Sequence, residues 1–352
     1  MSTRSPRVLI IGEFGAGALG LYYARAFAAL GWTTTRYDMW AGYTRGGVLA
    51  GSRVLRRLLR PALWALMARE AIALAGRETP DLVLSTKAPF LGRRAVRALR
   101  RAAGAPVAMV YPDSPYGAHT MRADVLTVLA EFDRVYIWSR RLLDRLHADG
   151  VTAAAYLPFA FDPTDYGAEG AVPRPECGRP HAIAFIGQRY DKREAWLAAL
   201  RGLDVGVWGL GWARSEVARS GAACVHGAPA LGAAAAAIYR GARVVLNVLH
   251  ADNLPAHNMR TFEIPPCRTV MLTEATEEIE AFFEPERACL TAADPRALRG
   301  QAERALADTA LARAVAEGGA RAAQPHTYEA RSRAIVADVV GTARALAPRA
   351  ER

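Results

Sequence analysis

Short apolar runs alternate with helical patterns through the first half of the chain. The runs that predict buried strands are residues 7–11, 33–37, 81–85, 107–111, 134–138 and 154–157. Helical segments separate them. The longest is residues 51–74, where leucines recur at three- and four-residue steps. Strands that alternate with helices predict a parallel, doubly wound sheet in an α/β fold.

The long segment at residues 51–74 contains Pro61 and an arginine cluster at its start, Arg53, Arg56, Arg57 and Arg60. Because proline is favoured in the first turn of a helix, we expect the helix to begin near Pro61. A basic helix end beside an apolar stripe is typical of a solvated helix that packs on a sheet. It is also compatible with attachment to a membrane surface.

The second half repeats the pattern of the first. Strand-like runs occur at residues 182–186, 205–208, 242–248 and 269–273, and residues 295–323 and 328–346 are helical. Residues 166–180 are rich in glycine and proline and show no periodicity, which indicates a linker. The predicted organisation is a first domain at residues 1–165, the linker, a second domain at 181–330, and a final helix at 331–352 that crosses back to the first domain.

The stretch Asn258 to Cys267 (NMRTFEIPPC) stands between two of these strands, after a polar loop. A loop that feeds a helix at the carboxyl end of a parallel strand is where open α/β sheets bind ligands. We expect the helix start to offer free N–H groups to a phosphate, with Arg260 adding a fixed charge. Glu263, one turn later, can accept hydrogen bonds from two ribose hydroxyls. This pattern indicates a nucleotide.

Together with the later segments VMLTEATEEIEAFFEPE and HTYEAR, this stretch resembles the CgeB-like (spore-maturation-type) glycosyltransferases, relatives of the family 4 enzymes. The resemblance covers residues 182–331. It implies a GT-B fold, two Rossmann-like domains facing across a cleft, and a hexosyltransferase-type enzyme that uses a nucleotide-diphosphate sugar. It also implies that Glu263 binds the donor ribose. The wider group has a second Glu eight residues earlier, where this chain has Pro255.

Other donor-site candidates lie earlier in the second half. Gly187 ends a predicted strand and lets backbone approach a ligand. Arg189 and Lys192 follow it and could reach a diphosphate. In GT-B donor domains a short turn holds the base through backbone groups, and the resemblance places His226 and Gly227 in that turn. Asn258 is the first residue of the stretch NMRTFEIPPC and is the last of the donor-site candidates.

Three residues of the first half are candidates for the base that deprotonates an acceptor hydroxyl. Asp113 follows a central strand, at the edge where a carboxylate can face the cleft, although an Asp before Ser-Pro is equally typical of a turn. Glu13 lies on the first loop. His119 is the third candidate, on a loop where histidine is usually only solvated.

A glycine-rich turn raises an alternative function. Gly15, Gly17 and Gly20 match G-x-G-x-x-G, and Asp38 follows in the next predicted strand, as in NAD-binding domains. The triplet begins beyond Gly12, which already ends the strand, whereas the fingerprint needs its first glycine at that turn. We therefore favour a cleft-facing turn, and keep an NAD-dependent oxidoreductase as an alternative. A non-catalytic nucleotide-sugar-binding protein is another.

Amino-acid composition narrows the class of protein to which the chain can belong. The chain has 352 residues, 52% hydrophobic and 22% charged, as expected of a folded two-domain protein without a signal peptide or membrane span. Four cysteines without metal-type spacing predict reduced thiols in the cytoplasm. With no Asp-x-Asp in the sequence, we expect metal-independent transfer and no cofactor, with Arg189, Lys192 and Arg260 stabilising the leaving diphosphate.

The net charge is unevenly distributed. Residues 1–150 hold 22 Lys/Arg and 11 Asp/Glu, a difference of +11, and the rest holds 23 of each. A basic first half suggests an anionic acceptor, which could be a small molecule, a glycan or a protein, or peripheral contact with the inner face of a membrane. An arginine-rich composition explains the choice of arginine but not this asymmetry. We expect no nucleic-acid partner.

Overall fold

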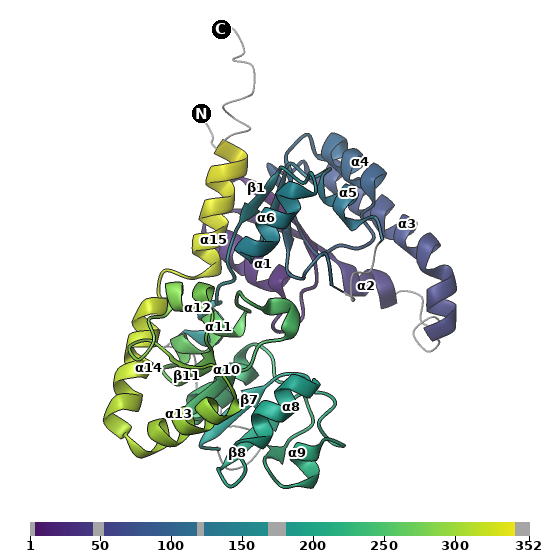
Figure 1. Cartoon of the computed structure of the whole chain (residues 1–352). Helices are drawn as coiled ribbons and strands as arrows, with labels where there is room; N and C mark the ends of the chain where they lie inside the picture. Colours follow the sequence, from purple (N-terminus) through teal and green to yellow (C-terminus); the bar gives the residue numbers. More distant parts are fainter. Residues whose placement is uncertain (1–3, 45–52, 118–122, 168–180, 342–352) are drawn as a thin grey trace. The chain divides into compact units, whose positions relative to one another are not determined.

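The computed structural model describes residues 4–44, 53–117, 123–167 and 181–341, and the strands form two separate sheets (Figure 1). The chain divides into two compact units. The first takes the described residues up to Pro158 and from Tyr328 onward, and the second is Phe159–Thr327. The sequence placed these borders at residues 165 and 330. Most of the predicted linker, residues 166–180, lies outside the described residues.

A six-stranded parallel sheet forms the centre of the first unit, with strand order β2-β1-β3-β4-β5-β6. Its strands are β1 (Arg7–Gly12), β2 (Thr33–Asp38), β3 (Leu82–Thr86), β4 (Val107–Tyr111), β5 (Arg134–Ile137) and β6 (Ala154–Tyr156). The helices are α1 (Leu19–Ala29), α2 (Met39–Thr44), α3 (Arg53–Glu78), α4 (Arg93–Ala103), α5 (Val125–Leu129), α6 (Arg140–Ala148), α15 (Tyr328–Ile335) and the π-helical η4 (Val336–Val340). All the strands predicted for this half are confirmed, with small shifts at their ends.

The second unit is built on another six-stranded parallel sheet, with strand order β12-β11-β10-β7-β8-β9. Its strands are β7 (Ile183–Ile186), β8 (Val205–Trp208), β9 (Cys224–Val225), β10 (Val244–Asn247), β11 (Val270–Glu274) and β12 (Leu290–Ala292). The helices are α7 (Pro163–Tyr166), α8 (Asp191–Ala198), α9 (Glu216–Arg219), α10 (Ala233–Gly241), η2 (Ala251–Asn253), α11 (Arg260–Glu263), η3 (Pro265–Cys267), α12 (Glu277–Phe282), α13 (Pro295–Ala307) and α14 (Thr309–Ala323). The short edge strands β9 and β12 were not predicted.

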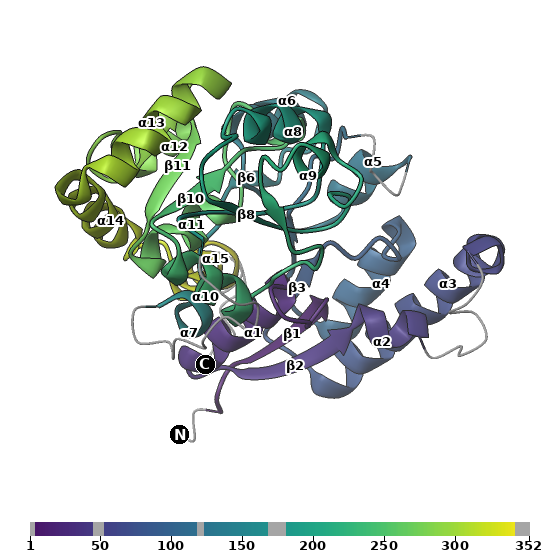
Figure 2. The ribbon, with the colours of Figure 1, turned by 90° about the horizontal axis from the view of Figure 1, so that it is seen from below.

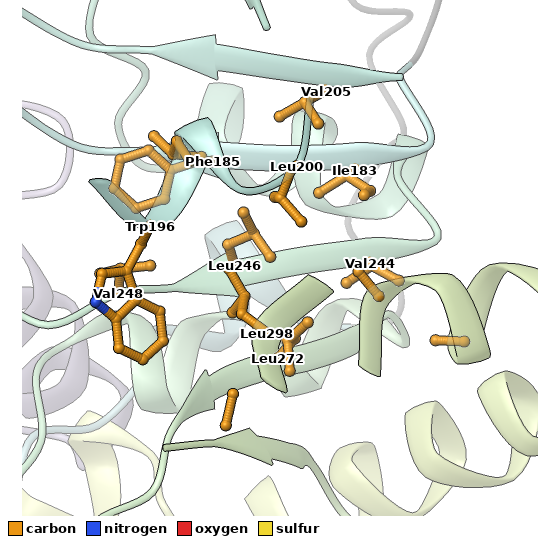
Figure 3. Packing of buried hydrophobic residues seen from close by; sticks show 14 of the residues in the cluster. Ile183, Phe185, Trp196, Leu200, Val205, Val244, Leu246, Val248, Leu272 and Leu298 are labelled. Atoms are coloured by element: carbon orange, nitrogen blue, oxygen red, sulfur yellow. The ribbon is translucent and has the colours of Figure 1, made fainter. Parts of the chain in front are cut away.

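Alternate residues of the second sheet bury one apolar face against helices (Figure 3). The cluster joins strand residues such as Phe185, Leu246 and Leu272 to Trp196 of α8 and Leu298 of α13. Figure 2 shows α13 and α14 running beside the β10 and β11 end of this sheet. Burying a side chain of this size contributes about 1.5–3 kcal/mol, so the cluster fixes the strands whose carboxyl ends carry the candidate site.

Close approaches explain two glycines of the first loop. A Cβ on Gly12 would lie 2.0 Å from the Thr86 hydroxyl oxygen of β3, and one on Gly20 would lie 2.4 Å from the Glu13 carbonyl oxygen. Gly17 has φ +77°, which favours glycine. A Cβ on Gly15 would meet nothing within 4 Å. Packing therefore explains Gly12 and Gly20, backbone conformation explains Gly17, and neither explains Gly15.

The chain returns to the first unit at α15, which packs against α1 (Figure 1). The rings of Tyr22 and Tyr328 stack with centroids 5.2 Å apart. Further along, both carboxylate oxygens of Asp338 accept hydrogen bonds from Arg134, at 2.6 and 2.7 Å, and the Tyr136 hydroxyl donates a third at 2.8 Å. These bonds tie the last described turns to β5.

The long basic helix differs from the prediction. The helix α3 begins at Arg53 and includes Pro61 in its interior. The expectation that Pro61 marks the helix start is therefore wrong. A proline inside a helix removes one N–H donor and crowds the carbonyl four residues earlier, which costs stability, but α3 continues through it. In the part of the chain that the structure describes, no helix is both long and apolar enough to cross a membrane.

Candidate functional site

Polar side chains converge where β7, β10 and β11 end in the second unit. In open parallel sheets, ligands bind at the carboxyl ends of the strands. Three residues at this edge, Asn247, Asn258 and Thr261, form a buried hydrogen-bonded network. The Asn258 amide donates to the Asn247 oxygen at 2.9 Å, and the Asn247 amide donates to the Thr261 hydroxyl at 3.1 Å. The network holds α11 against the end of β10.

The same network occupies the start of α11. The Thr261 N–H donates to the Asn258 side-chain oxygen at 3.1 Å, and the Asn258 N–H to the Thr261 hydroxyl at 3.4 Å. The N–H groups of Phe262 and Glu263 donate to the Met259 carbonyl. The expectation that this helix start offers free N–H groups to a phosphate is therefore wrong at these positions. Asn258 acts as a capping residue of the kind found at helix starts.

Arg260 turns back toward the end of β7. Its Nη1 donates to the Ile186 carbonyl at 2.5 Å, its Nε donates to the Asn247 oxygen at 3.4 Å, and its guanidinium lies over the Phe185 ring. A Cβ on Gly187 would meet the Arg260 Nη1 at 2.8 Å. Glycine at 187 therefore leaves room for the guanidinium, and the structure brings these two predicted residues together.

A second guanidinium, Arg193 on α8, lies in the same region, and sequence reasoning missed it. Only 5% of the residue is exposed. It donates to the Val248 carbonyl at 3.1 Å and to the Gln188 carbonyl at 2.9 Å. Burial, followed by the positive charge of Arg260, lowers the pKa of Arg193 to about 9. Two cations thus face the end of β7 closely enough to repel each other.

No carboxylate neutralises these two guanidiniums directly. Among the described residues, neither Arg193 nor Arg260 has a carboxylate oxygen within 4.0 Å. The charges of Glu274 and Glu263 act on Arg193 and Arg260 from beyond this distance, and a buried cation without a close carboxylate is costly. The arrangement therefore has a place for an anion.

The other two predicted cations are already paired. Arg189 forms ion pairs with Glu194 and with Asp191. Lys192 pairs with Glu274 at 2.5 Å, and the same carboxylate accepts the Leu249 N–H at 2.6 Å. Glu274 ends β11 and is buried, and sequence reasoning missed it as well. Arg189 and Lys192 lie near the carboxyl end of β7, as predicted. Their charges are compensated by carboxylates of the same unit.

Glu263 is buried, with 7% of the residue exposed. Burial raises the pKa of its carboxyl to about 7, and the positive charge of Arg260 and a hydrogen bond from Tyr166 oppose the rise. A carboxylate has about four lone-pair sites, so the bond from Tyr166 leaves acceptor capacity for a ligand. Glu263 therefore changes charge in the neutral pH range.

The predicted turn at His226 and Gly227 follows β9. Gly227 has φ +74°, so the turn uses the conformational freedom of glycine. The His226 ring stacks on the indole of Trp208, with centroids 4.3 Å apart, and its Nε2 lies 3.1 Å from that of His181. Burial, followed by the charge of His181, lowers the pKa of His226. The His226 side chain thus contacts residues of the second unit, and the backbone of the turn is what remains for a ligand.

The first unit carries the remaining candidates. Asp113, just beyond β4, is exposed and forms an ion pair with Lys87. Glu13 is half-buried in the loop after β1. His119 lies outside the described residues. Burial, with the charge of Asp113, raises the pKa of Tyr111 to about 12.

Asp38, the acidic residue of the NAD-type pattern, has a local partner. Its carboxylate accepts the Trp40 N–H at 2.8 Å and caps α2. Packing accounts for Gly20 and backbone conformation for Gly17, so these two glycines and Asp38 have structural explanations, while Gly15 has none.

Comparison with known proteins gives one family-model match and similar solved structures. A family model described as "Glycosyl transferase-like" matches residues 190–337. No curated protein matches the sequence. Among solved structures, the chain is similar to sucrose-phosphate synthase from Thermosynechococcus elongatus, with a TM-score of 0.66, 17% identity, and coverage of 97% of this chain and 99% of that one.

Two further structures resemble the chain with slightly lower TM-scores. One is Anabaena HepE in complex with UDP-glucose, with a TM-score of 0.64, 13% identity, and coverage of 97% of this chain and 100% of that one. The other is the α,α-trehalose 6-phosphate synthase from Burkholderia multivorans, with a TM-score of 0.64, 14% identity, and coverage of 99% and 100%. The predicted fold class is confirmed: the chain has the GT-B fold, α/β with two parallel sheets.

Proposed function

We propose that this protein is a glycosyltransferase that moves a sugar from a nucleotide-diphosphate sugar to an acceptor hydroxyl. One observation carries the proposal. Arg193 and Arg260 meet at the end of β7, and neither has a carboxylate within 4.0 Å among the described residues. A diphosphate brings the negative charge that this pair lacks. The family model supports glycosyl transfer, and the UDP-glucose complex of HepE supports this class of donor.

The chemistry follows from charge. When the bond between the sugar and the diphosphate breaks, negative charge develops on the departing phosphate oxygen. Guanidiniums that are already held in place stabilise this charge without reorganising. Arg260 is fixed by Ile186 and Asn247, and Arg193 by Val248 and Gln188. We expect these cations to serve in place of a catalytic metal.

The rest of the donor has matching groups. Glu263 in its ionised form accepts hydrogen bonds from ribose hydroxyls, as in the family 4 enzymes that the motif resembles. Gly187 lets the donor phosphates approach the backbone. The turn at His226 and Gly227 presents backbone groups to the base. We propose the CgeB-like kinship on the same motif, with hexose as the transferred sugar.

For the acceptor we retain Asp113 and Glu13 as candidate bases, together with His119. The basic first half favours an anionic acceptor or surface, but three of the five arginines of α4 are paired with carboxylates. On α4, Arg93 and Arg97 pair with Glu131, and Arg100 pairs with Asp133. The anionic partner therefore has fewer available charges there than the sequence suggested.

Calorimetry of UDP binding to the full chain tests the proposal. Losing one charge-assisted hydrogen bond costs about 1.5–3 kcal/mol, which is roughly tenfold to a hundredfold in affinity. We expect that loss in Arg260→Ala and in Arg193→Ala. Arg219→Ala serves as the matched control, because Arg219 pairs with Glu216 on the surface of the same unit. Wild-type affinity in both site variants would contradict the site.

The alternatives give different results. An NAD-dependent oxidoreductase would bind NAD and not a nucleotide sugar in a thermal-shift panel that contains both. A non-catalytic binding protein would bind the nucleotide sugar without releasing nucleoside diphosphate in any turnover assay.

A further inference from the structure

His181, Cys224 and His226 come together in the second unit. Each offers one metal-ligating atom, and these atoms lie within 4.8 Å of one another. His181 precedes β7, while Cys224 opens the edge strand β9 and His226 follows it. The two histidines are 45 positions apart in sequence, so no spacing rule could have found the group.

Asp204 orients the first histidine. Its Oδ1 lies 2.6 Å from the His181 Nδ1, and its Oδ2 accepts the Ala182 N–H at 3.0 Å. A carboxylate acceptor fixes the proton on Nδ1, which leaves a lone pair on the His181 Nε2. Metal-binding histidines usually have such a carboxylate or carbonyl partner on their other ring nitrogen.

The second histidine is held by packing. The His226 ring lies on the Trp208 indole with an interplanar angle of 4°. Its Nε2 then lies 3.1 Å from the Nε2 of His181. A Cβ on Gly206 would meet the His181 ring at 2.4 Å, so glycine in β8 leaves the space that the ring occupies. Neither imidazole has to move far to share an ion.

We propose that these three residues bind Zn²⁺. Zinc takes histidine nitrogen at about 2.0–2.1 Å and thiolate at about 2.3 Å, usually in a tetrahedron. Two nitrogens on such an ion lie roughly 3.3 Å apart, and a nitrogen and a sulfur about 3.6 Å apart. The observed 3.1 Å between the nitrogens is close to the first value. Cys224 is exposed, which gives the ion a route from solvent.

Binding changes the protonation of the group. In the absence of metal, the His226 Nε2 donates a proton to the lone pair of the His181 Nε2. With Zn²⁺, that proton moves to the Nδ1 of His226, and the Cys224 thiol releases its proton to solvent. One proton is released for each ion bound. A water molecule would supply the fourth ligand.

The ion would cross-link the edge strand β9 to the rest of the sheet. The edge strand β9 has two residues and pairs only with β8 among the described strands. A zinc ion would join it across β8 to the start of β7. The site uses none of the residues that hold the donor phosphates, although His226 also belongs to the turn proposed for the base. The metal titration is made without donor, so its outcome does not depend on the proposed transferase activity.

The test uses the full chain, stripped with a chelator and titrated with Zn²⁺ against a chromophoric competitor. We expect one equivalent to bind tightly and to raise the melting temperature. Cys224→Ser and His226→Gln should each weaken binding by at least about a hundredfold. Asp204→Asn should weaken it by about tenfold to a hundredfold, because it acts through His181. His250→Gln, a histidine paired with Asp252 outside the group, should bind like wild type.

Co²⁺ reports the ligand type. Wild type should show a thiolate-to-cobalt charge-transfer band that Cys224→His lacks, while this variant still binds the metal. Unchanged melting temperatures of the metal-free variants exclude unfolding as the cause. Weak binding of several ions, shared by wild type and all variants, would mean adventitious surface binding only and would overturn the proposal. Tight binding that survives Cys224→Ser and His226→Gln together would also overturn it.

Discussion

Glu263→Gln removes the one buried carboxylate that we place on the donor ribose. The pKa of the Glu263 carboxyl is about 7, above its ordinary value of 4.5, mainly because of burial. If only the ionised form binds ribose, the binding-competent fraction falls from about nine-tenths at pH 8 to about one-tenth at pH 6. We therefore expect UDP affinity to fall about tenfold over this range in wild type.

The Glu263→Gln variant separates the titration of Glu263 from the titration of the ligand. The terminal phosphate of UDP itself titrates near pH 6. Glu263→Gln keeps the shape without the charge, so its remaining pH dependence belongs to the nucleotide. The ratio of wild-type to variant affinity, measured by calorimetry from pH 6 to pH 8, should rise about tenfold. A constant ratio would refute the role of Glu263 as a ribose ligand.

Unfolding without ligand tests the titration itself. The folded state binds the Glu263 proton more tightly than the unfolded chain. This contribution to stability is complete below pH 4.5 and is lost as the pH rises through 7. At about 1.4 kcal/mol per pH unit the loss is at most about 3 kcal/mol. The stability of Glu263→Gln relative to wild type should increase between pH 5 and pH 8. The exposed carboxylate variant Glu317→Gln should show no such trend, and a flat difference for Glu263→Gln would refute the raised pKa.

Three further predictions concern the first unit. Gly12→Ala should lower the free energy of unfolding by about 1–3 kcal/mol, because its Cβ meets Thr86 at 2.0 Å, while Gly15→Ala should change it little; equal losses in chemical denaturation would contradict the packing account. Asp338→Asn should destabilise the fold by about 1.5–3 kcal/mol at neutral pH. Since Arg134 lowers the pKa of Asp338, wild type should lose this advantage as the pH falls below 4, and a difference that persists in acid would count against it. Co-sedimentation with phosphatidylserine vesicles should weaken steeply with salt and on replacing Arg53, Arg56, Arg57 and Arg60 together by glutamine; a flat salt response would leave the basic excess as composition alone.

Local sequence patterns were enough to predict most of both sheets. A buried parallel strand is an apolar run, and its length and the turn residues around it are local properties. The runs at residues 107–111 and 205–208 match β4 and β8 without any shift. The two-residue strand β9 is too short to carry a periodic signal, and it forms because β8 offers an edge.

The candidate site was predicted only in part, because its chemistry depends on contacts between distant residues. The run Arg189, Lys192 and Arg193 has three similar cations, but only the fold shows that the first two are paired with Glu194 and Glu274. Arg193 was overlooked because its hydrogen bonds to the Val248 and Gln188 carbonyls have no local sequence signature. The role of Asn258 as a cap, which uses N–H groups that we expected to be free, likewise depends on side-chain geometry.

Release of nucleoside diphosphate from a panel of nucleotide-diphosphate sugars tests the central claim most directly. The full chain is incubated with each donor, with and without candidate acceptors, and the released diphosphate is measured. The account predicts release from at least one donor, a loss of about tenfold or more in Arg260→Ala and in Arg193→Ala, and wild-type release in Arg219→Ala. Release that is unchanged in both site variants, or binding of NAD with no binding or release of any nucleotide sugar, would contradict it.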